Sequence, residues 1–384
     1  MFLDDFLSAK PLYYEKIDYT RMPRIYDRVK SSLNTPKIIH LIGTNGKGTT
    51  GRFLATALHS MNFKTIHYAS PHILKFNERI WIDGNDVDDK VLQEAHVKLQ
   101  SILTISESKE LSYFEYTTLL CLMICKECDY LVMEAGLGGE HDATVVFDKI
   151  LTLVTPISYD HEAFLGTTLQ EIATTKLNAI QNNAILALQK EKEVYKIANI
   201  LAKEKNLNIQ IYDELLSNND KIKIKNIAKS LKLESCLVEN LSHCISALNF
   251  LNLEYCESDF NNSKLFGRLT YIKSNIVVDV GHNSLAAKAI KDALKPNKFI
   301  LVYNSYKDKD YKKILQILKP IIKSVQIIAI NDKRIESYAQ LKKTLKDLEI
   351  QYSLFKAITD NEKYLVFGSF SVVEAFMKRN KRVN

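Results

Sequence analysis

Short apolar runs alternate with longer amphipathic stretches along the chain, the order typical of strands and helices in an α/β protein. In the first half, the apolar runs predict strands at 36–42, 63–69, 130–136, 149–155 and 184–188. The amphipathic stretches predict helices at 49–61, 114–127 and 169–180. Strands linked by helices in this way indicate a mostly parallel sheet flanked by helices.

The alternation starts again near residue 276. Strands are predicted at 275–280, 298–303, 324–330 and 364–369, and helices at 285–295, 310–321, 335–348 and after 369. We therefore expect two units, residues 1–267 and a smaller Rossmann-like α/β unit at 276–384, joined by a linker at 268–275. Residues 205–235 are rich in Lys and Asn, and their mixed periodicity predicts no particular element.

Composition and charge narrow the class of protein. The chain has 384 residues, of which 46% are hydrophobic and 25% charged, as in a globular protein with two domains. No apolar stretch approaches the roughly 20 residues of a membrane helix, and the start MFLDDFLSAK carries acids where a signal peptide has positive charge. We therefore expect a cytoplasmic protein with no membrane partner. The net charge of +7 could favour nucleic acid and equally an acidic small substrate. Because this charge is spread along the chain rather than clustered, we expect no nucleic-acid partner.

Three of the six cysteines lie close together, at positions 121, 125 and 128. Cys125 and Cys128 form a C-x-x-C pair, but a second such pair or an H-x-x-x-H, which would complete a zinc site, is absent from the sequence. Cys121 and Cys125 are spaced for one face of an apolar helix. We interpret them as small buried hydrophobic residues.

The sequence GTNGKGTT follows the first predicted strand at residues 43–50. It does not fit the common phosphate-loop pattern G-x-x-x-x-G-K-[ST], because Lys47 is followed by Gly48 and the hydroxyl residue comes one place later. The glycines still allow backbone N–H groups to approach phosphate oxygens, at the start of a helix whose dipole favours an anion. Lys47 adds positive charge, and the hydroxyl of Thr49 is a suitable ligand for Mg²⁺.

Other polar residues follow the ends of neighbouring strands, where ligands bind in open α/β sheets. They are Ser70, Glu134 and His161 in the first unit, and Asp279, His282 and Asn283 in the second. Each has an ordinary structural interpretation as well, such as a lysine-paired acid for Glu134 or a packed or surface histidine for His161. Their collective position at strand ends favours a ligand site.

In the order and spacing of its motifs, the chain resembles the bacterial folylpolyglutamate synthase/dihydrofolate synthase family of the Mur ligase superfamily. The motifs are GTNGKGTT (43–50), SPHILKFNERI (70–80), FEYTTL (114–119), LVMEAGLGGEHDAT (131–144), DHEAFLGTTLQEIATTK (160–176), FGR (266–268), VVDVGHN (277–283), DKD (308–310) and FGSF (367–370). In this superfamily the hydroxyl residue of the phosphate loop follows GKG. The resemblance implies a Mur-ligase-like ATP-binding domain with a phosphate loop, followed by a smaller Rossmann-like domain.

The resemblance also implies roles for individual residues. ATP would be bound by Asn45, Gly46, Lys47, Gly48, Thr49, Asn240, Arg268 and Asp279. One Mg²⁺ would lie on Thr49 and Glu134, and a second on Ser70, Glu134 and His161. The pterin side would be contacted by Phe114, Glu115, His141, Asp142 and Ala143. His282 would position phosphate or glutamate, although a structural hydrogen bond is an equal alternative.

Lys176 matches the family position at which a lysine is carbamylated. An ammonium group beside two Mg²⁺ ions would be repelled, whereas a carbamate would be attracted. The chain departs from the family around this lysine, with Thr175 before it and Leu177 after it, and it has Glu140 where the family has an arginine near the pterin. The departures bear on pterin contacts and on the carbamate more than on ATP.

The family reaction is an ATP-dependent ligation of L-glutamate to dihydropteroate or to reduced folates through an acyl phosphate. The resemblance therefore predicts a ligase that acts on small molecules, and we expect a monomer. Alternatives are a folylpolyglutamate synthase without the dihydrofolate activity and a cell-wall Mur-type amino-acid ligase. The cell-wall enzyme would need a UDP-binding domain before the phosphate loop, which this chain reaches by residue 43. A nucleic-acid-binding NTPase is a rival of another class, but it would need a clustered basic face.

Overall fold

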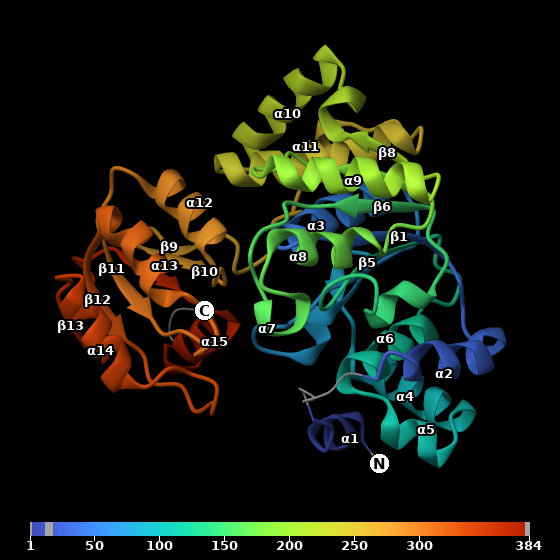
Figure 1. Ribbon diagram of the computed structural model, residues 1–384, viewed down its shortest axis with the longest axis horizontal. Helices are drawn as coiled ribbons and strands as arrows, with labels where there is room; N and C mark the ends of the chain where they lie inside the picture. The colour runs from blue at the N-terminus through green and yellow to red at the C-terminus, as the bar shows by residue number, and fades with distance from the viewer. Residues whose placement is uncertain (1, 12–17, 381–384) are drawn as a thin grey trace.

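The computed structural model describes residues 2–11 and 18–380, which form two units with a sheet in each (Figure 1). Among these residues, the first sheet has eight strands in the order β4-β3-β2-β5-β1-β6-β7-β8. All neighbours from β2 to β8 pair in parallel, and β3 and β4 complete one edge with antiparallel pairing. The strands are β1 (Lys37–Ile42), β2 (Thr65–Tyr68), β3 (Ile80–Ile82), β4 (Asn85–Asp86), β5 (Tyr130–Glu134), β6 (Leu151–Val154), β7 (Asn183–Leu186) and β8 (Asn208–Ile211).

Helices cover both faces of this sheet (Figure 1). The α-helices are α1 (Leu3–Ser8), α2 (Arg21–Val29), α3 (Lys47–Ser60), α4 (Asp89–Ile102), α5 (Ile105–Glu110), α6 (Tyr113–Ile124), α7 (Glu162–Leu165), α8 (Leu169–Leu177), α9 (Lys192–Glu204), α10 (Asn218–Ser230) and α11 (Ser235–Phe250). Short 3₁₀ helices are η1 (Lys30–Ser32), η2 (Phe76–Arg79), η3 (Ala143–Val146), η4 (Tyr212–Leu215) and η5 (Glu257–Phe260).

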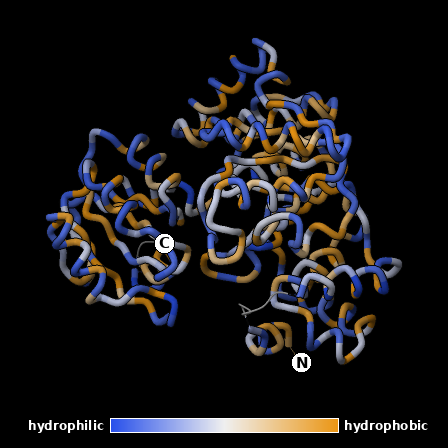
Figure 2. Tube along the Cα trace, in the orientation of Figure 1, coloured by the Kyte–Doolittle hydropathy of each residue, from blue (hydrophilic) through white to orange (hydrophobic). Residues whose placement is uncertain are grey.

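Successive residues of β5 face opposite sides of the sheet, as the pleat of a strand requires. Leu131 and Met133 belong to the core cluster that α2, α4 and α6 complete. Val132 belongs to the opposite cluster, with residues of α3 and α11. In Figure 2 the hydrophobic colour accordingly follows the strands inside the molecule, whereas outer helices such as α9 alternate between the two colours.

Several helices begin at a residue whose side chain satisfies the free N–H groups of the first turn. Ser112 and Glu115 form a reciprocal capping box at the start of α6, and Thr168 and Glu171 form another at the start of α8. These caps fix where each helix starts relative to the preceding loop. They therefore help to place Lys176, which lies near the end of α8.

The second sheet has the order β13-β12-β11-β14-β10-β9, and among its described strands only β9 pairs antiparallel. Its strands are β9 (Thr270–Lys273), β10 (Ile276–Asp279), β11 (Phe299–Tyr303), β12 (Ile322–Ile327), β13 (Tyr352–Leu354) and β14 (Tyr364–Phe367). Its helices are α12 (Ser284–Leu294), α13 (Tyr311–Leu318), η6 (Lys319–Ile321), α14 (Tyr338–Asp347) and α15 (Phe370–Arg379). Helices α12, α13 and α14 pack on one face and α15 on the other.

The expected α/β class with two mostly parallel sheets is confirmed. The linker expected at 268–275 is wrong in one respect, because it contains β9, the edge strand of the second sheet. β9 alternates between half-buried and exposed residues, so it has no apolar run that would reveal it in the sequence. The unplaced stretch 205–235 contains β8, η4 and α10. The division of the chain into two domains stays a proposal.

The cysteines at the end of helix α6 are part of the core. Cys121 and Cys125 are buried in the core with free thiols, as small hydrophobic residues would be. Burial raises the pKa of the Cys125 thiol well above its usual value, so this thiol stays protonated.

Within the described ranges, no helix has both the length and the apolar composition needed to cross a lipid bilayer.

The hydrophobic core of the second unit can be tested at its central strand, β11. Leu301 is fully buried, so we expect Leu301→Ala to lower the free energy of unfolding by about 2–5 kcal/mol through lost contacts and a residual cavity. Leu354, on the edge strand β13, is 53% exposed, and Leu354→Ala is the matched control, with an expected change of about 0.5 kcal/mol or less. Urea unfolding followed by circular dichroism measures both. Equal losses in the two variants would contradict the assigned core.

Candidate active site

A cavity of about 280 Å³ lies between the carboxyl ends of the first sheet's strands and the second unit. Its walls are the loops after β1, β2, β5 and β6, together with helices α8 and α11 and the connection from β10 to α12. It is lined by most of the site residues that the sequence predicted, namely Asn45, Gly46, Lys47, Gly48, Thr49, Ser70, Glu134, His161, Lys176, Asn240, Arg268, Asp279 and His282. Because these residues come from both units, the approach of the units assembles the cavity.

The glycine loop after β1 has a backbone that other residues rarely adopt. Gly43 and Gly46 have φ angles of 130° and 96°. A Cβ atom on Gly43 would lie 2.2 Å from Oγ1 of Thr155, so a side chain there would displace the loop. The backbone N–H of Thr44 donates to the carbonyl of Pro156 (3.0 Å), which ties the loop to the end of β6. Helix α3 then starts at Lys47, so its N-terminus lines the cavity, an arrangement that suits a phosphate group.

Lys47 and Glu134 lie together at the centre of this edge. The Nζ of Lys47 donates to the carbonyl of Gly43 (3.2 Å) and is 3.9 Å from Oε1 of Glu134. The backbone N–H of Ser70 donates to Oε2 of Glu134 (3.3 Å). Burial raises the pKa of Glu134, and the positive charges of Lys47 and Arg268 oppose that change. This carboxylate and the hydroxyls of Ser70 and Thr49 line one cavity, and such hard oxygen donors fit Mg²⁺.

Lys176 is almost fully buried beneath the phosphate loop, with a residue exposure of 3%. Its Nζ donates to the carbonyl of Gly43 (3.1 Å). Burial, and then the charge of Lys47, lower the pKa of Lys176 to about 7. A large fraction of this amine is therefore neutral near neutral pH, and a neutral amine is nucleophilic.

Asp160, His161 and His282 form a group of potential metal ligands within the described part of the chain. One ligand atom from each lies within 4.8 Å of the others. His161 has a φ angle of 53°, unusual for a residue with a side chain, and it lies at the start of α7. The sequence grouped His161 with Ser70 and Glu134, and these three residues do line the same cavity. The structure adds Asp160 and His282 as immediate neighbours of His161.

Arg268 and Asp279 line the cavity next to β9 and β10, whereas Asn240 lines it from α11, where its Oδ1 accepts from the hydroxyl of Thr50 (3.4 Å). The Oδ2 of Asp279 accepts from the backbone N–H of Leu269 (2.9 Å), and Oδ1 accepts from that of Gly281 (2.7 Å). Burial raises the pKa of Asp279, whereas Arg268 opposes the rise. The guanidinium of Arg268 lies over the ring of Phe370, 5.2 Å from its centroid. These contacts fix the position of both charged groups.

Two predicted pterin-side residues lie on α6. The Oε2 of Glu115 accepts from the backbone N–H of Ser112 (2.7 Å) and from Nε of Arg21 (2.8 Å). Glu115 is therefore engaged in a helix cap and in a buried ion pair. The ring of Phe114 packs against Gly136, where a Cβ atom would lie 2.7 Å from it. Phe114 thus lies next to the loop that lines the cavity, and neither Phe114 nor Glu115 lines the cavity itself.

The other predicted pterin-side residues lie in the loop after β5. The Oδ1 of Asp142 accepts from the backbone N–H and the hydroxyl of Thr144, and Oδ2 accepts from the N–H of Leu137. Ala143 is buried in the core. His141 is exposed, and its ring lies 4.2 Å from that of Tyr19. The structure gives Asp142 and Ala143 structural partners and leaves His141 with an aromatic neighbour.

The structure also brings to the site three residues to which the sequence gave no individual role, although Asp160 and Asn283 stand among the strand-end residues. Asp160 and Asn283 occur in the strand-end motifs, and Lys309 is the centre of the DKD motif. The Nζ of Lys309 donates to Oδ1 of Asp160 (2.6 Å). The motifs were a usable signal for these residues, but they do not reveal that Asp160 and Lys309 meet across the two units.

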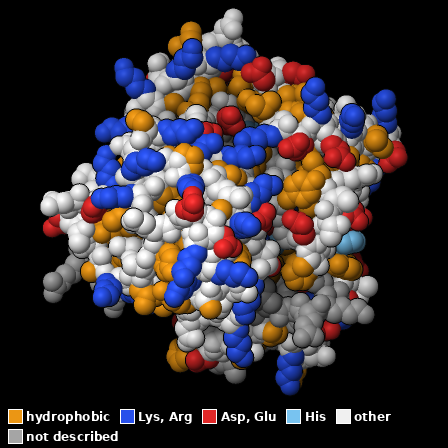
Figure 3. All heavy atoms as spheres, turned by 60° about the vertical axis from the view of Figure 1, so that its left-hand side comes forward, with side chains coloured by type: hydrophobic (Ala, Val, Ile, Leu, Met, Phe, Trp, Pro, Cys, Tyr) orange, Lys and Arg blue, Asp and Glu red, His pale blue; other side chains and the backbone are white. Residues whose placement is uncertain are grey.

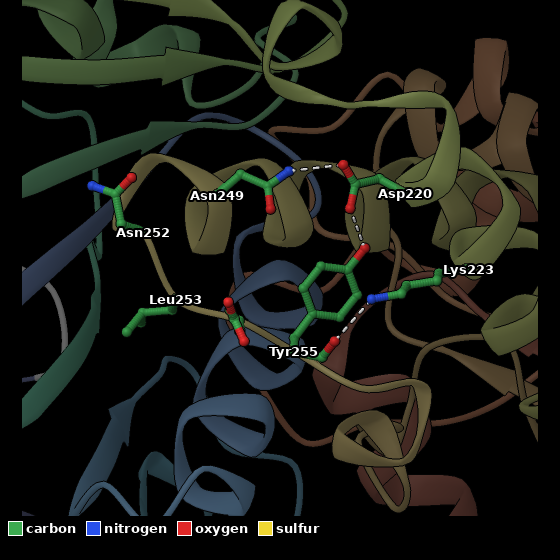
Figure 4. A pocket seen from close by; sticks show the side chains of 7 residues that line it. Asp220, Lys223, Asn249, Asn252, Leu253 and Tyr255 are labelled. Carbon is green, nitrogen blue, oxygen red and sulfur yellow. Dashed lines mark hydrogen bonds between the residues drawn. The ribbon is translucent and has the colours of Figure 1, made fainter.

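A second hollow lies between α10, α11 and the loop after α11, away from the phosphate loop (Figure 4). In it, the hydroxyl of Tyr255 donates to Asp220 (2.6 Å), and Nδ2 of Asn249 donates to the same carboxylate (3.1 Å). The Nζ of Lys223 donates to the backbone carbonyl of Tyr255 (3.0 Å). Because these polar groups satisfy one another, we interpret the hollow as a structural junction.

Comparisons with known proteins agree with this geometry. No family model matches the chain. A crystal structure of Helicobacter pylori folylpolyglutamate synthetase is 40% identical, with 99% of this chain and 98% of that chain covered and a TM-score of 0.80. Dihydrofolate synthase/folylpolyglutamate synthase of Haemophilus influenzae is 29% identical, with 95% of each chain covered.

A third comparison bears on the fold alone. Folylpolyglutamate synthase of Mycobacterium tuberculosis, in a structure complexed with ADP and AMPPCP, is 20% identical, with 98% of this chain and 97% of that chain covered and a TM-score of 0.83. The close likeness to the Helicobacter pylori enzyme extends over nearly the whole of both chains. The chain therefore belongs to the folylpolyglutamate synthase/dihydrofolate synthase family of ATP-dependent ligases.

Proposed function

We propose that the chain joins L-glutamate to dihydropteroate, giving dihydrofolate, and to reduced folates, giving folylpolyglutamates. One observation carries the proposal: a single cavity joins the phosphate loop and Glu134 of the first unit to Arg268, Asp279 and His282 of the second. A ligase that activates an acid with ATP needs a phosphate site and an acceptor site in one enclosed space. The name of the Haemophilus influenzae relative supports the two acceptors.

The phosphates of ATP would lie on the backbone of residues 45–49, with the positive charge of Lys47 beside them. Asn240, on α11, and Arg268 would complete the nucleotide site together with Asp279, the last from the second unit. Thr49 and Glu134 would bind one Mg²⁺, and Ser70, Glu134 and His161 a second. The glycines of the phosphate loop leave space that a Cβ atom would fill, which fits the phosphates of ATP. The oxygen atoms of Thr49, Ser70 and Glu134 are hard donors, which fit Mg²⁺.

The reaction places specific demands on the chain's own residues. The carboxylate of the acceptor attacks the γ-phosphoryl group to give an acyl phosphate and ADP, and the amine of L-glutamate then displaces phosphate. Lys47 offsets the charge of the transferring group, and bound Mg²⁺ would supply further charge neutralisation. His282 lines the cavity near Asp160 and would orient phosphate or glutamate. Enclosure of the bound substrates between the two units would limit hydrolysis of the acyl phosphate by water.

For the pterin we propose the region of Phe114 and His141, next to the loop after β5 that lines the cavity, with Glu115, Asp142 and Ala143 acting through the loops that they stabilise. Phe114 stacks on Tyr68, with ring centroids 5.9 Å apart, and it packs against the loop that lines the cavity. Flat aromatic surfaces of this kind suit a flat heterocycle. The carboxylates of Glu115 and Asp142 already accept hydrogen bonds from the chain, which supports a positioning role for them.

We further propose that Lys176 carries a carbamate in the active enzyme. The nitrogen of its neutral amine forms a bond to the carbon of CO₂, and a proton is released to water. The side chain then ends in a negatively charged carbamate. Because the pKa of Lys176 is lowered to about 7, the neutral amine is available near neutral pH. The carbamate replaces a positive charge close to Lys47 and the proposed Mg²⁺ ions with a negative one.

The rival functions make different demands. On the face that Figure 3 shows, Lys and Arg side chains are mixed with acidic and uncharged ones, which does not favour a nucleic-acid site.

For the oligomeric state and the location, we propose a monomer that acts in the cytoplasm. We place the boundary of the two domains before β9, since β9 belongs to the second sheet.

Product analysis tests the proposed function. With ATP, Mg²⁺, L-glutamate and either dihydropteroate or a tetrahydrofolate, we expect ADP release in step with glutamate joined to each acceptor. Lys47→Met removes the charge beside the phosphates and should lower both rates by about 100-fold or more. Lys98→Met, which changes an exposed lysine of α4, is the control. Turnover of one acceptor alone would contradict the double activity, and unchanged coupling in Lys47→Met would contradict the phosphate site.

The carbamate is tested through bicarbonate. We expect wild-type activity to fall in bicarbonate-depleted buffer and to recover on addition of bicarbonate. At equal concentrations of dissolved CO₂, recovery should be faster at about pH 8 than at about pH 6, because the neutral fraction of Lys176 rises as the pH passes its pKa of about 7. Lys176→Ala should lose most activity at any bicarbonate level, and Lys176→Glu, which restores a negative charge, should recover part of it without responding to bicarbonate. Full activity of Lys176→Ala would exclude the carbamate.

A further inference from the structure

Asp160 lies between the two units, in the loop that leads from β6 to α7, and it is only 7% exposed. The roles proposed above involve its neighbour His161 but leave Asp160 itself without one. A buried carboxylate is costly unless its oxygens are paired and hydrogen-bonded. The partners of Asp160 therefore show what the structure uses it for.

Most of those partners belong to the second unit. Oδ1 of Asp160 accepts from Nζ of Lys309 (2.6 Å) and from the backbone N–H of His161 (2.9 Å). Oδ2 accepts from Nδ2 of Asn283 (3.2 Å) and lies 3.4 Å from Nε2 of His282. Lys309 precedes α13, whereas His282 and Asn283 precede α12. One acid of the first unit thus contacts two separate loops of the second.

The network continues into the phosphate loop. The side-chain amides of Asn45 and Asn283 exchange two hydrogen bonds of 2.9 Å each. Oδ1 of Asn283 also accepts from the backbone N–H of Ala286 and so caps α12. The position of α12 is thereby tied to the phosphate loop through Asn283, and to the loop of Lys309 through Asp160.

Lys309 is the charged group that depends most on this contact. Its side chain is 8% exposed, and its other acidic neighbour, Asp308, is 3.4 Å away and largely exposed. An ammonium group buried in this way is stable only while its carboxylate partner is present. If the units separate, both charges return to water, so the pair forms only when the units are together.

We propose that the pair between Asp160 and Lys309 holds the second unit against the phosphate loop during ligation, with Lys309 as a positioning residue. The proposal rests on the proposed function, because ATP contacts both units there. The pair favours the arrangement in which Asn283 reaches the phosphate loop and His282 lies beside Asp160. Without it, the competent arrangement is less populated, and the apparent affinity for ATP falls by the same factor. Chemistry inside the assembled site is retained.

Steady-state kinetics of the full chain test this role. We expect Lys309→Met to raise the KM for ATP by about tenfold or more, because it leaves Asp160 without its main partner, with kcat changed by less than about threefold. Lys309→Arg keeps the charge and should restore most of the affinity. Lys312→Met, at an exposed lysine of α13, is the matched control and should match the wild type. A fall in kcat with an unchanged KM would overturn the proposal, since it would show direct participation in the chemistry.

Small-angle X-ray scattering gives a readout that does not require folate turnover. With ADP and Mg²⁺, the wild type and Lys312→Met should have the same radius of gyration, and Lys309→Met and Asp160→Asn should both have a larger one. The double variant should be no larger than either single variant, because one contact is removed in all three. Equal radii for all the proteins would refute the pair as the closing contact, even if the glutamate ligation itself is confirmed.

Discussion

Charged side chains that are buried between the two units are stable only when they have partners of opposite charge, and the arrangement of the site depends on these pairs. Glu134 lies 3.9 Å from Lys47, and Asp160 lies 2.6 Å from Lys309. The first pair lies within one unit, and the second joins the two units. By our proposal, the second pair favours the arrangement in which the second unit lies against the phosphate loop.

The phosphate loop itself depends on a steric constraint. Gly43 approaches Thr155 so closely that a Cβ atom has no room, and its φ angle also favours glycine. The close approach ties the loop to the end of β6, the strand that leads to Asp160 and His161. The same loop carbonyl, that of Gly43, accepts from both Lys47 and Lys176. The loop thus sets the relative positions of the phosphate site and of the lysine proposed to carry a carbamate.

Residues that look like ligand contacts in the sequence can instead support the site. Glu115 caps α6 and pairs with Arg21, and Asp142 organises the loop after β5 through three hydrogen bonds. Both carboxylates are buried, so their lone pairs had to be satisfied by donors from the chain. Their neighbours Phe114 and His141 carry the aromatic rings that we propose for the pterin. A sequence motif identifies such a group of residues, but it does not show which of them touch the ligand and which only hold the site in place.

The sequence by itself determined the α/β class, the central strands and the residues around the cavity, because apolar runs and strand-end motifs are local signals. Lys47, Glu134 and His161 were found in this way. The sequence did not reveal β9, whose residues alternate between half-buried and exposed. Nor did it reveal the pairing of Asp160 with Lys309, which lie 149 residues apart. Only the tertiary structure decided those features, since a long-range ion pair depends on how the units pack and leaves no periodic pattern in the chain.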